Sequence, residues 1–303
     1  MNRLRIGSRG SMLALAQSNW VKQRLIEHYP DLPVELAIIK TSGDRFVDTP
    51  IPAIGGKGVF TKEIEDALQR DDIDIAVHSM KDLPTELPAG LVIAAVPERE
   101  DARDVLVSRE KLSLNDLRSG ARVATGSLRR RAQLLHHRGD LAITAIRGNV
   151  DTRLRKLDQG EADALIMAAA GLKRIGRTEC ISEYLSDDVC VSAVAQGALG
   201  IESRADDSTR QWLAFLHDAD TFAEVTAERA LLERLAGGCH VPIGARARVE
   251  GVTLKMIGIV ASPDGKSLCK AMISGQAHDG AKLGRQLAEQ LLKDGADKIL
   301  TLT

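Results

Sequence analysis

Short apolar runs alternate with helical patterns along the first two-thirds of the chain. Residues 12–28, 60–69 and 128–138 have the apolar spacing of helices that bury one face. Alternation of this kind predicts an α/β fold with mostly parallel sheets. We expect strands at residues 4–7, 34–40, 73–77, 91–96, 105–107, 122–125, 143–146, 164–167 and 189–194.

The alternation is interrupted once, by a polar, proline-led segment at residues 97–103. We interpret this segment as a crossing between two α/β lobes, with a return crossing near residues 194–197. Two lobes joined by two crossings resemble the architecture of periplasmic binding proteins, which hold a ligand in the cleft between the lobes.

After residue 218 the pattern changes to a helix at 221–235, three strand-like runs and a final helix at 279–293. This order predicts a small C-terminal α+β domain on a short linker. The domains expected are therefore lobe 1 (residues 1–98 and 194–217), lobe 2 (residues 99–193) and a C-terminal domain (residues 218–303).

Composition favours a water-soluble globular protein, because 44% of the 303 residues are hydrophobic and 27% are charged. No apolar run approaches the roughly 18 residues that would span a bilayer. The N-terminus lacks the apolar core of a secretion signal, so we expect a cytoplasmic protein. We also expect a monomer, since no exposed apolar stripe stands out. The cysteines are widely spaced without a C-x-x-C pair, which argues against a metal site and a disulfide framework: Cys180, Cys190, Cys239 and Cys269.

Charge is unevenly distributed, although the net charge is only −1. Residues 121–177 hold twelve cations, ten of them arginine, against five anions. Arginine is suited to bidentate contacts with carboxylates and phosphates. A nucleic-acid partner is disfavoured by the near-neutral total and by the 3% of aromatic residues, which leaves few platforms for stacked bases. The segment therefore indicates a small acidic ligand.

The most specific cluster is residues 74–84, DIAVHSMKDLP. A β-branched strand runs directly into a polar loop with Lys81 and Asp82 side by side before Pro84. Ligands of α/β sheets bind outside the carboxyl ends of strands, where this loop falls. A solvated ion pair explains the spacing equally well.

Residues 123–131 place arginines where a helix begins. Ser127 is a good N-cap, and Arg129 and Arg130 then fall in the first turn, where the helix dipole disfavours cations. We therefore expect an anion at this helix terminus, although solvent screening would also make the arginines harmless.

The same arrangement recurs at residues 146–153, where Asn149 is the expected cap between Arg147 and Arg153. Arg9 and Ser11 follow the first strand, and Arg174 follows another. We expect these strand ends to line one cleft.

Two further features have two interpretations each. The glycine-rich connection 40–60 lacks the spacing of a nucleotide-binding loop and is either a mobile lid or a disordered connector. Cys239 lies beside Gly237 and Gly238, which would leave its thiol accessible for attachment, but a buried inert thiol is the commoner fate of a cysteine.

Taken together, these segments resemble the porphobilinogen deaminase family, whose members are also called hydroxymethylbilane synthases. The matching motifs occur in the family's order and cover nearly the whole chain. They are Gly7–Arg9 with Leu13–Gln17, Gly55–Phe60, His78–Pro84, Gly126–Arg130, Arg147–Val150, Gln196–Gly197 and Gly237–Cys239.

The resemblance implies a deaminating transferase of tetrapyrrole and haem biosynthesis. Four porphobilinogen molecules would be joined head to tail on a dipyrromethane cofactor, attached to Cys239 by a thioether, and released as hydroxymethylbilane. Asp82 would be the catalytic carboxylate. Each pyrrole brings an acetate and a propionate, which would explain the arginine surplus. The positions carried over as carboxylate-binding are Arg9, Ser11, Lys57, Ser79, Lys81, Thr125, Ser127, Arg129, Arg130, Arg147, Arg153, Arg174 and Gln196.

The alternative is a two-lobed protein that binds small anions without catalysis. Such a binder needs neither a covalent adduct on Cys239 nor the pair of Lys81 and Asp82. The intact mass of the purified protein distinguishes the two, because only the synthase carries two pyrrole rings on a cysteine.

Overall fold

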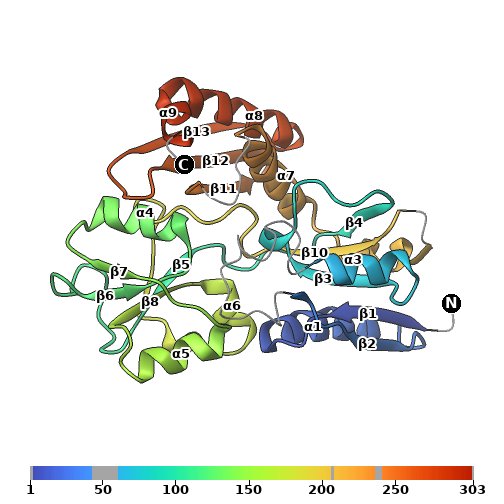
Figure 1. Ribbon diagram of the computed structural model, residues 1–303. Helices are drawn as coiled ribbons and strands as arrows, with labels where there is room; N and C mark the ends of the chain where they lie inside the picture. The colour runs from blue at the N-terminus through green and yellow to red at the C-terminus, as the bar shows by residue number, and fades with distance from the viewer. Residues whose placement is uncertain (1–2, 43–60, 206–207, 236–240, 302–303) are drawn as a thin grey trace. The chain divides into compact units, whose positions relative to one another are not determined.

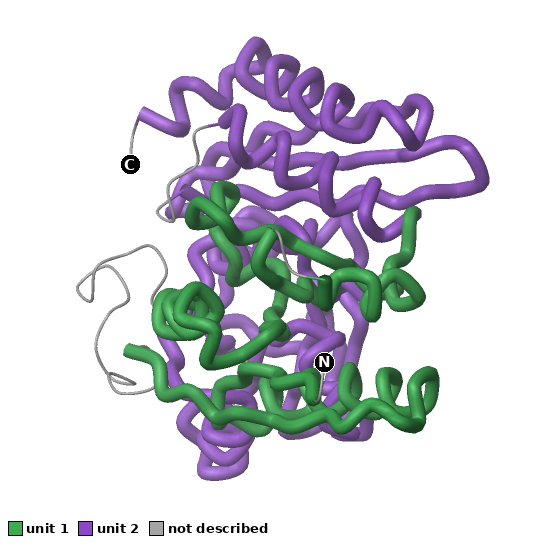
Figure 2. The backbone as a smooth tube through the Cα atoms, turned by 90° about the vertical axis from the view of Figure 1, so that its right-hand side faces the viewer, with its two compact units in different colours: residues 1–99, 198–219 green, residues 100–197, 220–303 purple. Residues whose placement is uncertain are grey.

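The computed structural model describes residues 3–42, 61–205, 208–235 and 241–301. The chain divides into two compact units (Figure 2), Met1–Arg99 with Ala198–Ala219, and Glu100–Gly197 with Asp220–Thr303. Figure 1 labels their helices and strands. Within the described part, no helix has the length and apolar character needed to cross a membrane. The three-domain division expected from the sequence stays a prediction.

Unit 1 is built on a five-stranded sheet with the order β2-β1-β3-β10-β4. Its core lies on both faces of the sheet. Val21 and Leu25 of α1 pack with Ile75 of β3 on one face, and Ile64 and Leu68 of α3 pack with Ala76 on the other. The elements are β1 (Leu4–Ser8), α1 (Met12–His28), β2 (Val34–Ile38), α3 (Lys62–Gln69), β3 (Ile75–Ser79), the 3₁₀ turn η2 (Met80–Asp82), β4 (Leu91–Ala95), β10 (Leu199–Arg204) and η4 (Ser208–Leu216).

Strand β10 runs against its neighbours. It pairs antiparallel with β3 and with β4, whereas β1 pairs parallel with β2 and β3. Four strands of the sheet therefore point one way, and the strand that follows the return crossing points the other way. Most strands of this sheet therefore run in the same direction, as expected for the predicted α/β class.

Unit 2 contains a second sheet with the same plan and the order β7-β6-β8-β5-β9. Here β5, which follows the first crossing, is antiparallel to β8 and β9, while β6 is parallel to β7 and β8. The elements are β5 (Asp104–Ser108), β6 (Arg122–Ala124), α4 (Leu128–His137), β7 (Ala142–Thr144), α5 (Val150–Asp158), β8 (Ala164–Ala168), α6 (Ala169–Arg174), η3 (Thr178–Cys180) and β9 (Glu183–Tyr184).

The remainder of unit 2 is an antiparallel three-stranded sheet, β11-β12-β13, which packs against α7 and α8. Its other face shares a small core with α4, formed by Ala132, Val191, Ile257, Ile259 and Ala261. The elements are α7 (Ala219–Arg234), β11 (Ile243–Glu250), β12 (Thr253–Ala261), β13 (Leu268–Gln276), η5 (Ala277–Asp279), α8 (Gly280–Leu291), a π-helical turn η6 (Leu292–Ala296) and α9 (Asp297–Leu300).

One predicted strand is wrong. Residues 189–194 form no strand, and the backbone of Val191 is held instead by the side chains of Arg129 and Gln133. Strand β10 lies a few residues further on and was missed. Its sequence, LGIESR, contains the buried glutamate Glu202, and a charged residue at this position is not typical of a central strand.

Candidate functional site

A pocket in unit 1 brings several of the predicted site residues together. Arg9, Ser11, Ser79 and Asp82 all line it. Arg9 and Ser11 come directly after β1, and Ser79 and Asp82 come at the end of β3. Because β1 and β3 are parallel neighbours, their carboxyl ends open onto the same edge of the sheet, where ligands of α/β sheets bind.

The local backbone fixes the position of Asp82. Strand β3 ends at Ser79, and the chain turns through η2 with Met80 buried beneath it. The amide of Met80 donates to the carbonyl of Ala198, 3.0 Å away, and the amide of Leu83 donates back to the carbonyl of Met80. These bonds leave Asp82 exposed at the pocket. Lys81 is also exposed but is not among the residues that line it.

The hydroxyl groups of the pocket also have structural partners. The Oγ of Ser11 caps α1 by accepting from the amide of Ala14 at 3.3 Å. The Oγ of Ser79 accepts from Nε2 of Gln17 at 2.9 Å. Gln17 is nearly buried and lines the pocket, so it belongs to the site although the sequence pattern did not single it out.

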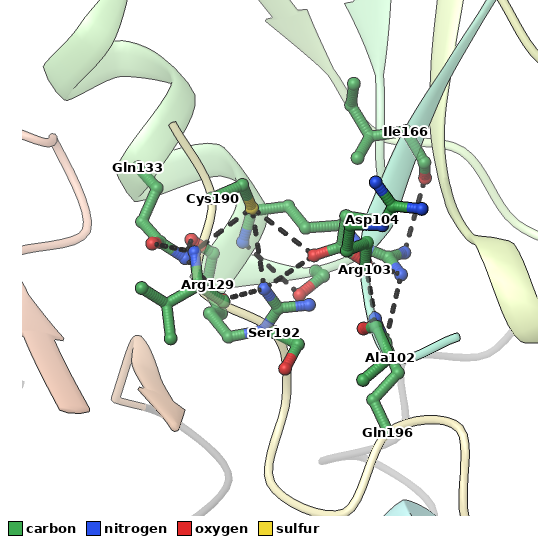
Figure 3. A network of polar contacts seen from close by, with 12 residues as sticks. Ala102, Arg103, Asp104, Arg129, Gln133, Ile166, Cys190, Ser192 and Gln196 are labelled. Carbon is green, nitrogen blue, oxygen red and sulfur yellow. Dashed lines mark hydrogen bonds and ion pairs between the residues drawn. The ribbon is translucent and has the colours of Figure 1, made fainter. Parts of the chain in front are cut away.

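In unit 2 the first turn of α4 lies in a buried polar network centred on Asp104 (Figure 3). Arg129 donates from Nη1 to Oδ2 of Asp104 at 2.7 Å and to the carbonyl of Val191 at 2.5 Å. Arg130 contacts Oδ1 of Asp104 through Nε at 3.0 Å and through Nη2 at 2.7 Å. The side chain of Gln196 donates to the same oxygen at 2.8 Å.

The two arginines of this network share one buried carboxylate as their counter-charge. Asp104 is fully buried, and both arginines are 6% exposed. Burial alone would raise the pKa of Asp104, but the charges of Arg129 and Arg130 outweigh it and hold the pKa well below its usual range. Asp104 thus supplies one negative charge beside the two arginines at this helix terminus. Binding of a ligand by Arg129, Arg130 and Gln196 stays a prediction.

Arg153 and Arg174 differ from this pair, because neither has an ion-paired carboxylate among the described residues. Each donates to a backbone carbonyl instead, Arg153 to Gly148 at 2.8 Å and Arg174 to Gly197 at 2.6 Å. Burial lowers the pKa of Arg174 to about 10. It also lowers the pKa of Arg153, and the charge of nearby Arg130 lowers it further. The charge of Glu100 opposes the effect of burial on Arg174, whereas Arg153 has no such opposing charge. Desolvated cations with little compensation fit an anionic ligand.

The predicted caps of α4 and α5 are confirmed. Ser127 accepts from the amide of Arg130 at 3.4 Å, and Asn149 accepts from the amide of Thr152 at 2.9 Å. The hydroxyl of Thr125 accepts from the amide of Ser127 at 3.2 Å. Arg147 lies half-buried just before the second cap.

The predicted site residues therefore fall into two groups. One group belongs to unit 1 and consists of Arg9, Ser11, Ser79, Lys81 and Asp82, and the other belongs to unit 2. Lys57 and Cys239 lie outside the described residues, and so does most of the glycine-rich connection. The single cleft expected from the sequence stays a prediction. The residues of unit 2 are Thr125, Ser127, Arg129, Arg130, Arg147, Arg153, Arg174 and Gln196.

Of the cysteines in the described part, Cys190 is unsuited to covalent chemistry. It is buried, its thiol donates to Oδ2 of Asp104 at 3.3 Å, and burial raises the pKa of the thiol to about 12. Burial also raises the pKa of Cys269. Since the thiolate is the reactive form, neither environment favours attachment of a cofactor.

The sequence analysis missed Asp104 altogether. An aspartate before an apolar strand has the same pattern whether it is solvated or buried. It also missed a pair behind the pocket, His78 of β3 and Glu202 of β10, whose Nε2 and Oε2 atoms are 3.1 Å apart with both side chains buried. The signal available was that each is a charged or titratable residue inside an apolar run.

Comparison with known proteins gives family-model matches over most of the chain. Residues 4–211 match the model described as porphobilinogen deaminase, dipyromethane cofactor binding domain. Residues 222–293 match the C-terminal domain of porphobilinogen deaminase.

Curated relatives carry the same name. The porphobilinogen deaminase of Trichlorobacter lovleyi is 53% identical over 98% of this chain and 96% of its own. That of Geobacter sulfurreducens is 52% identical over 99% and 94%. Among solved structures, the methionine-binding protein MetQ aligns with a TM-score of 0.45 at 16% identity, covering 71% of this chain and 89% of its own. The aliphatic sulphonate-binding protein SsuA of Escherichia coli gives 0.40 at 17% identity, covering 77% and 70%.

Proposed function

The chain belongs to the porphobilinogen deaminase family, and on that premise we propose that Asp82 is its catalytic carboxylate and Cys239 the attachment point of its dipyrromethane cofactor. Enzymes of this family are transferases that join four porphobilinogen molecules head to tail and release hydroxymethylbilane, in tetrapyrrole biosynthesis. The chain is therefore an enzyme, and a binding protein without catalysis is not favoured.

The observation that carries the assignment of Asp82 is its pocket. Asp82 is the one carboxylate among the described residues that line it, and Arg9, Ser11 and Ser79 share that lining. Loss of ammonia from porphobilinogen leaves an electron-poor azafulvene with positive charge spread to the ring nitrogen. A fixed carboxylate stabilises that developing charge. The neighbouring guanidinium and hydroxyl groups suit the acetate and propionate of the same ring.

Binding of the growing acidic chain is assigned to the cations of unit 2. Arg153 and Arg174 are half-buried and have no ion-paired carboxylate among the described residues, so an anionic ligand would relieve their desolvation. Thr125 and Ser127 lie just before α4, and Arg147 lies just before α5, the helix that carries Arg153. When bound, the dipyrromethane group supplies the first acceptor ring. We assign its carboxylates to these side chains together with Arg129 and Arg130.

Attachment at Cys239 is supported by the motif, and two of the three cysteines among the described residues have environments that disfavour attachment. Cys190 is buried with a raised pKa, and Cys269 also has a raised pKa. We further assign residues 1–98 with 194–217 to lobe 1, residues 99–193 to lobe 2 and residues 218–303 to a domain that carries the cofactor. The protein is expected to act in the cytoplasm as a monomer without a nucleic-acid partner.

The experiment is intact-mass spectrometry of the purified protein and its variants. Wild type should show an excess mass of two pyrrole rings, and Cys239→Ser should lack it. Cys180→Ser is the matched control, since the thiol of Cys180 is partly exposed, and this variant should keep the adduct. Asp82→Ala should keep the adduct but lose turnover. An adduct that persists in Cys239→Ser, or near-normal turnover in Asp82→Ala, would overturn the respective assignment.

A further inference from the structure

Behind the pocket of unit 1 lies a buried cluster of titratable groups that the proposed mechanism does not use. His78 of β3 and Glu202 of β10 are 4% and 0% exposed as side chains, with Nε2 and Oε2 3.1 Å apart. Glu65 of α3 is 7% exposed. His78 itself lines the pocket together with Asp82. The cluster therefore connects the interior of the unit with the proposed catalytic carboxylate.

The sheet register explains why these groups meet. In the β3–β10 ladder, His78 is opposite Gly200 and Glu202 is opposite Ala76. Side chains two positions apart on a strand share a face, so His78 and Glu202 are diagonal neighbours on one face of the sheet. Ala76 on this face packs against α3, which carries Glu65. Gly200, opposite His78, adds no side chain to this face.

The atoms of the cluster are not satisfied elsewhere. Nε2 of His78, both carboxylate oxygens of Glu202 and Oε1 of Glu65 are buried without a well-directed hydrogen bond among the described residues. Two bare acceptors 3.1 Å apart would repel, so a proton lies between His78 and Glu202. The distance suits a hydrogen bond, although the contact is not well directed in this structure. Misaligned hydrogen bonds are common at catalytic groups before substrate binds. Buried polar groups left unsatisfied gather at functional sites.

Glu65 also interacts electrostatically with this pair. Burial raises the pKa of the Glu65 carboxyl, and the charge of Glu202 raises it further, while Thr61 and His78 oppose these effects. We place the proton of the 3.1 Å contact on Nε2 of His78, which donates to Oε2 of Glu202. Nδ1 is then the ring nitrogen that can accept a further proton. A carboxylate in this position fixes the tautomer of an imidazole and stabilises the imidazolium that forms when it takes a proton.

The chemistry of chain extension needs such a group. Ammonia leaves porphobilinogen with the electron pair of the broken carbon–nitrogen bond. The α-carbon of the acceptor ring then bonds to the methylene carbon, and the proton on that α-carbon must be removed. Three of the described residues that line the pocket are ionisable: Arg9, His78 and Asp82. Arginine stays protonated. Asp82 must stay ionised beside the positive charge.

We propose that His78, held through Nε2 by Glu202, is a second catalytic residue and accepts the proton released from the acceptor ring as each new carbon–carbon bond forms. The carbon–hydrogen bond breaks, its electron pair restores the aromatic ring, and the proton passes to Nδ1. The imidazolium, neutralised by Glu202, returns the proton to water before the next substrate enters. This inference rests on the proposed function of the pocket.

The test uses the cofactor-loaded enzyme and the variants His78→Gln and Glu202→Gln. The amide nitrogen of glutamine can still donate toward Glu202 but cannot accept and return a proton. His28→Gln is the matched control, because His28 is exposed in the same unit and lies outside the pocket. Addition of pyrroles is followed by intact mass after rapid mixing with porphobilinogen, at a series of pH values.

In His78→Gln we expect each addition to slow by about 10²-fold or more, which is the usual contribution of a general base. The pH profile should lose one limb, whereas KM, cofactor content and thermal stability stay close to wild type. His78→Gln that extends the chain at the wild-type rate with an unchanged pH profile would overturn the proposal. So would a loss explained entirely by lower cofactor content or stability. Failure of the proposed function would instead appear as wild-type enzyme that adds no pyrroles.

A second measurement does not depend on turnover. Nitrogen-15 NMR of histidine-labelled protein reports which ring nitrogen carries the proton. Of the 7 histidines, the signal assigned to His78 should show a protonated, hydrogen-bonded Nε2 in wild type and should change in Glu202→Gln, while the others stay in place. An unchanged His78 signal in Glu202→Gln would refute the pairing.

Discussion

Replacement of Asp104 by asparagine offers the sharpest test of the internal charge balance in unit 2. The carboxylate of Asp104 accepts from Arg129, Arg130 and Gln196 inside the core, and its side chain has no exposed surface. Asparagine has nearly the same shape but only one oxygen, and its NH₂ group would face guanidinium donors. Two buried cations would lose their counter-charge.

Breaking a buried ion pair from one side costs about 3–5 kcal/mol, because the remaining charge is left uncompensated. Two arginines share this carboxylate, so we expect Asp104→Asn to reach at least this range. For a unit of this size, that loss lowers the midpoint of thermal unfolding by roughly 6–20 °C. Circular dichroism at pH 7 measures the shift.

Asp140→Asn is the matched control. Asp140 pairs with Arg138 at 2.7 Å, but the two side chains are 39% and 19% exposed. Water replaces an exposed partner at little cost, so this variant should unfold close to wild type. A free energy of unfolding of Asp104→Asn within about 1 kcal/mol of the wild-type value would refute the role of Asp104 as the buried counter-charge of these arginines.

The sign of the pH dependence follows from the depressed pKa of Asp104. An aspartate with a folded-state pKa below its unfolded value of about 3.9 stabilises the protein above that value. The contribution declines as the pH falls through the folded-state pKa. The difference in unfolding free energy between wild type and Asp104→Asn should therefore be constant above about pH 5 and shrink below about pH 4. A difference that grows in acid would contradict this assignment.

Three further substitutions test other parts of the structure. Arg153→Gln should raise KM for porphobilinogen about ten-fold or more, because it removes a charge-assisted hydrogen bond to the substrate. Thermal stability should not fall, because the substitution removes a positive charge close to that of Arg130. An unchanged KM would argue against substrate binding by Arg153. Gly197→Ala should lower the free energy of unfolding by more than about 1 kcal/mol, as measured by denaturant titration. The φ angle of Gly197 is +89°, and a Cβ atom there would lie 2.2 Å from the carbonyl oxygen of Glu100. A variant as stable as wild type would exclude this backbone conformation. Cys190→Ser should keep the cofactor mass, because the buried thiol is not the anchor, and a folded variant without the adduct would refute that statement.

Local signals in the sequence predicted local structure well. The helix 12–28 agrees with α1 at both ends, and Ser127 and Asn149 cap α4 and α5 as expected. Each of these predictions depends on residues a few positions apart, where spacing and capping chemistry decide the outcome. The ends of β1 and β3 likewise deliver Arg9 and Asp82 to one pocket, because parallel neighbours share an edge.

The predictions that failed depended on contacts distant in sequence. Residues 189–194 have the β-branched pattern of a strand, but side chains of α4 satisfy the backbone of Val191 there. Asp104 lies 25 residues from Arg129, and nothing local marks it as their counter-ion. Asp104 supplies one anion beside these arginines, and the binding of a ligand by them stays a prediction.

The position of β10 has a consequence for the order in which the molecule forms during synthesis. Strand β4 pairs with β10 alone, and β10 is also the neighbour of β3. When the first hundred residues have left the ribosome, their sheet still lacks its second-to-last strand, and β4 has no neighbour. The strands of the sheet β7-β6-β8-β5-β9 all lie between Asp104 and Tyr184, so they are all synthesised before β10. The amino-terminal unit must therefore wait for a segment translated after that sheet, so its unpaired strand edges are exposed longest in the nascent chain.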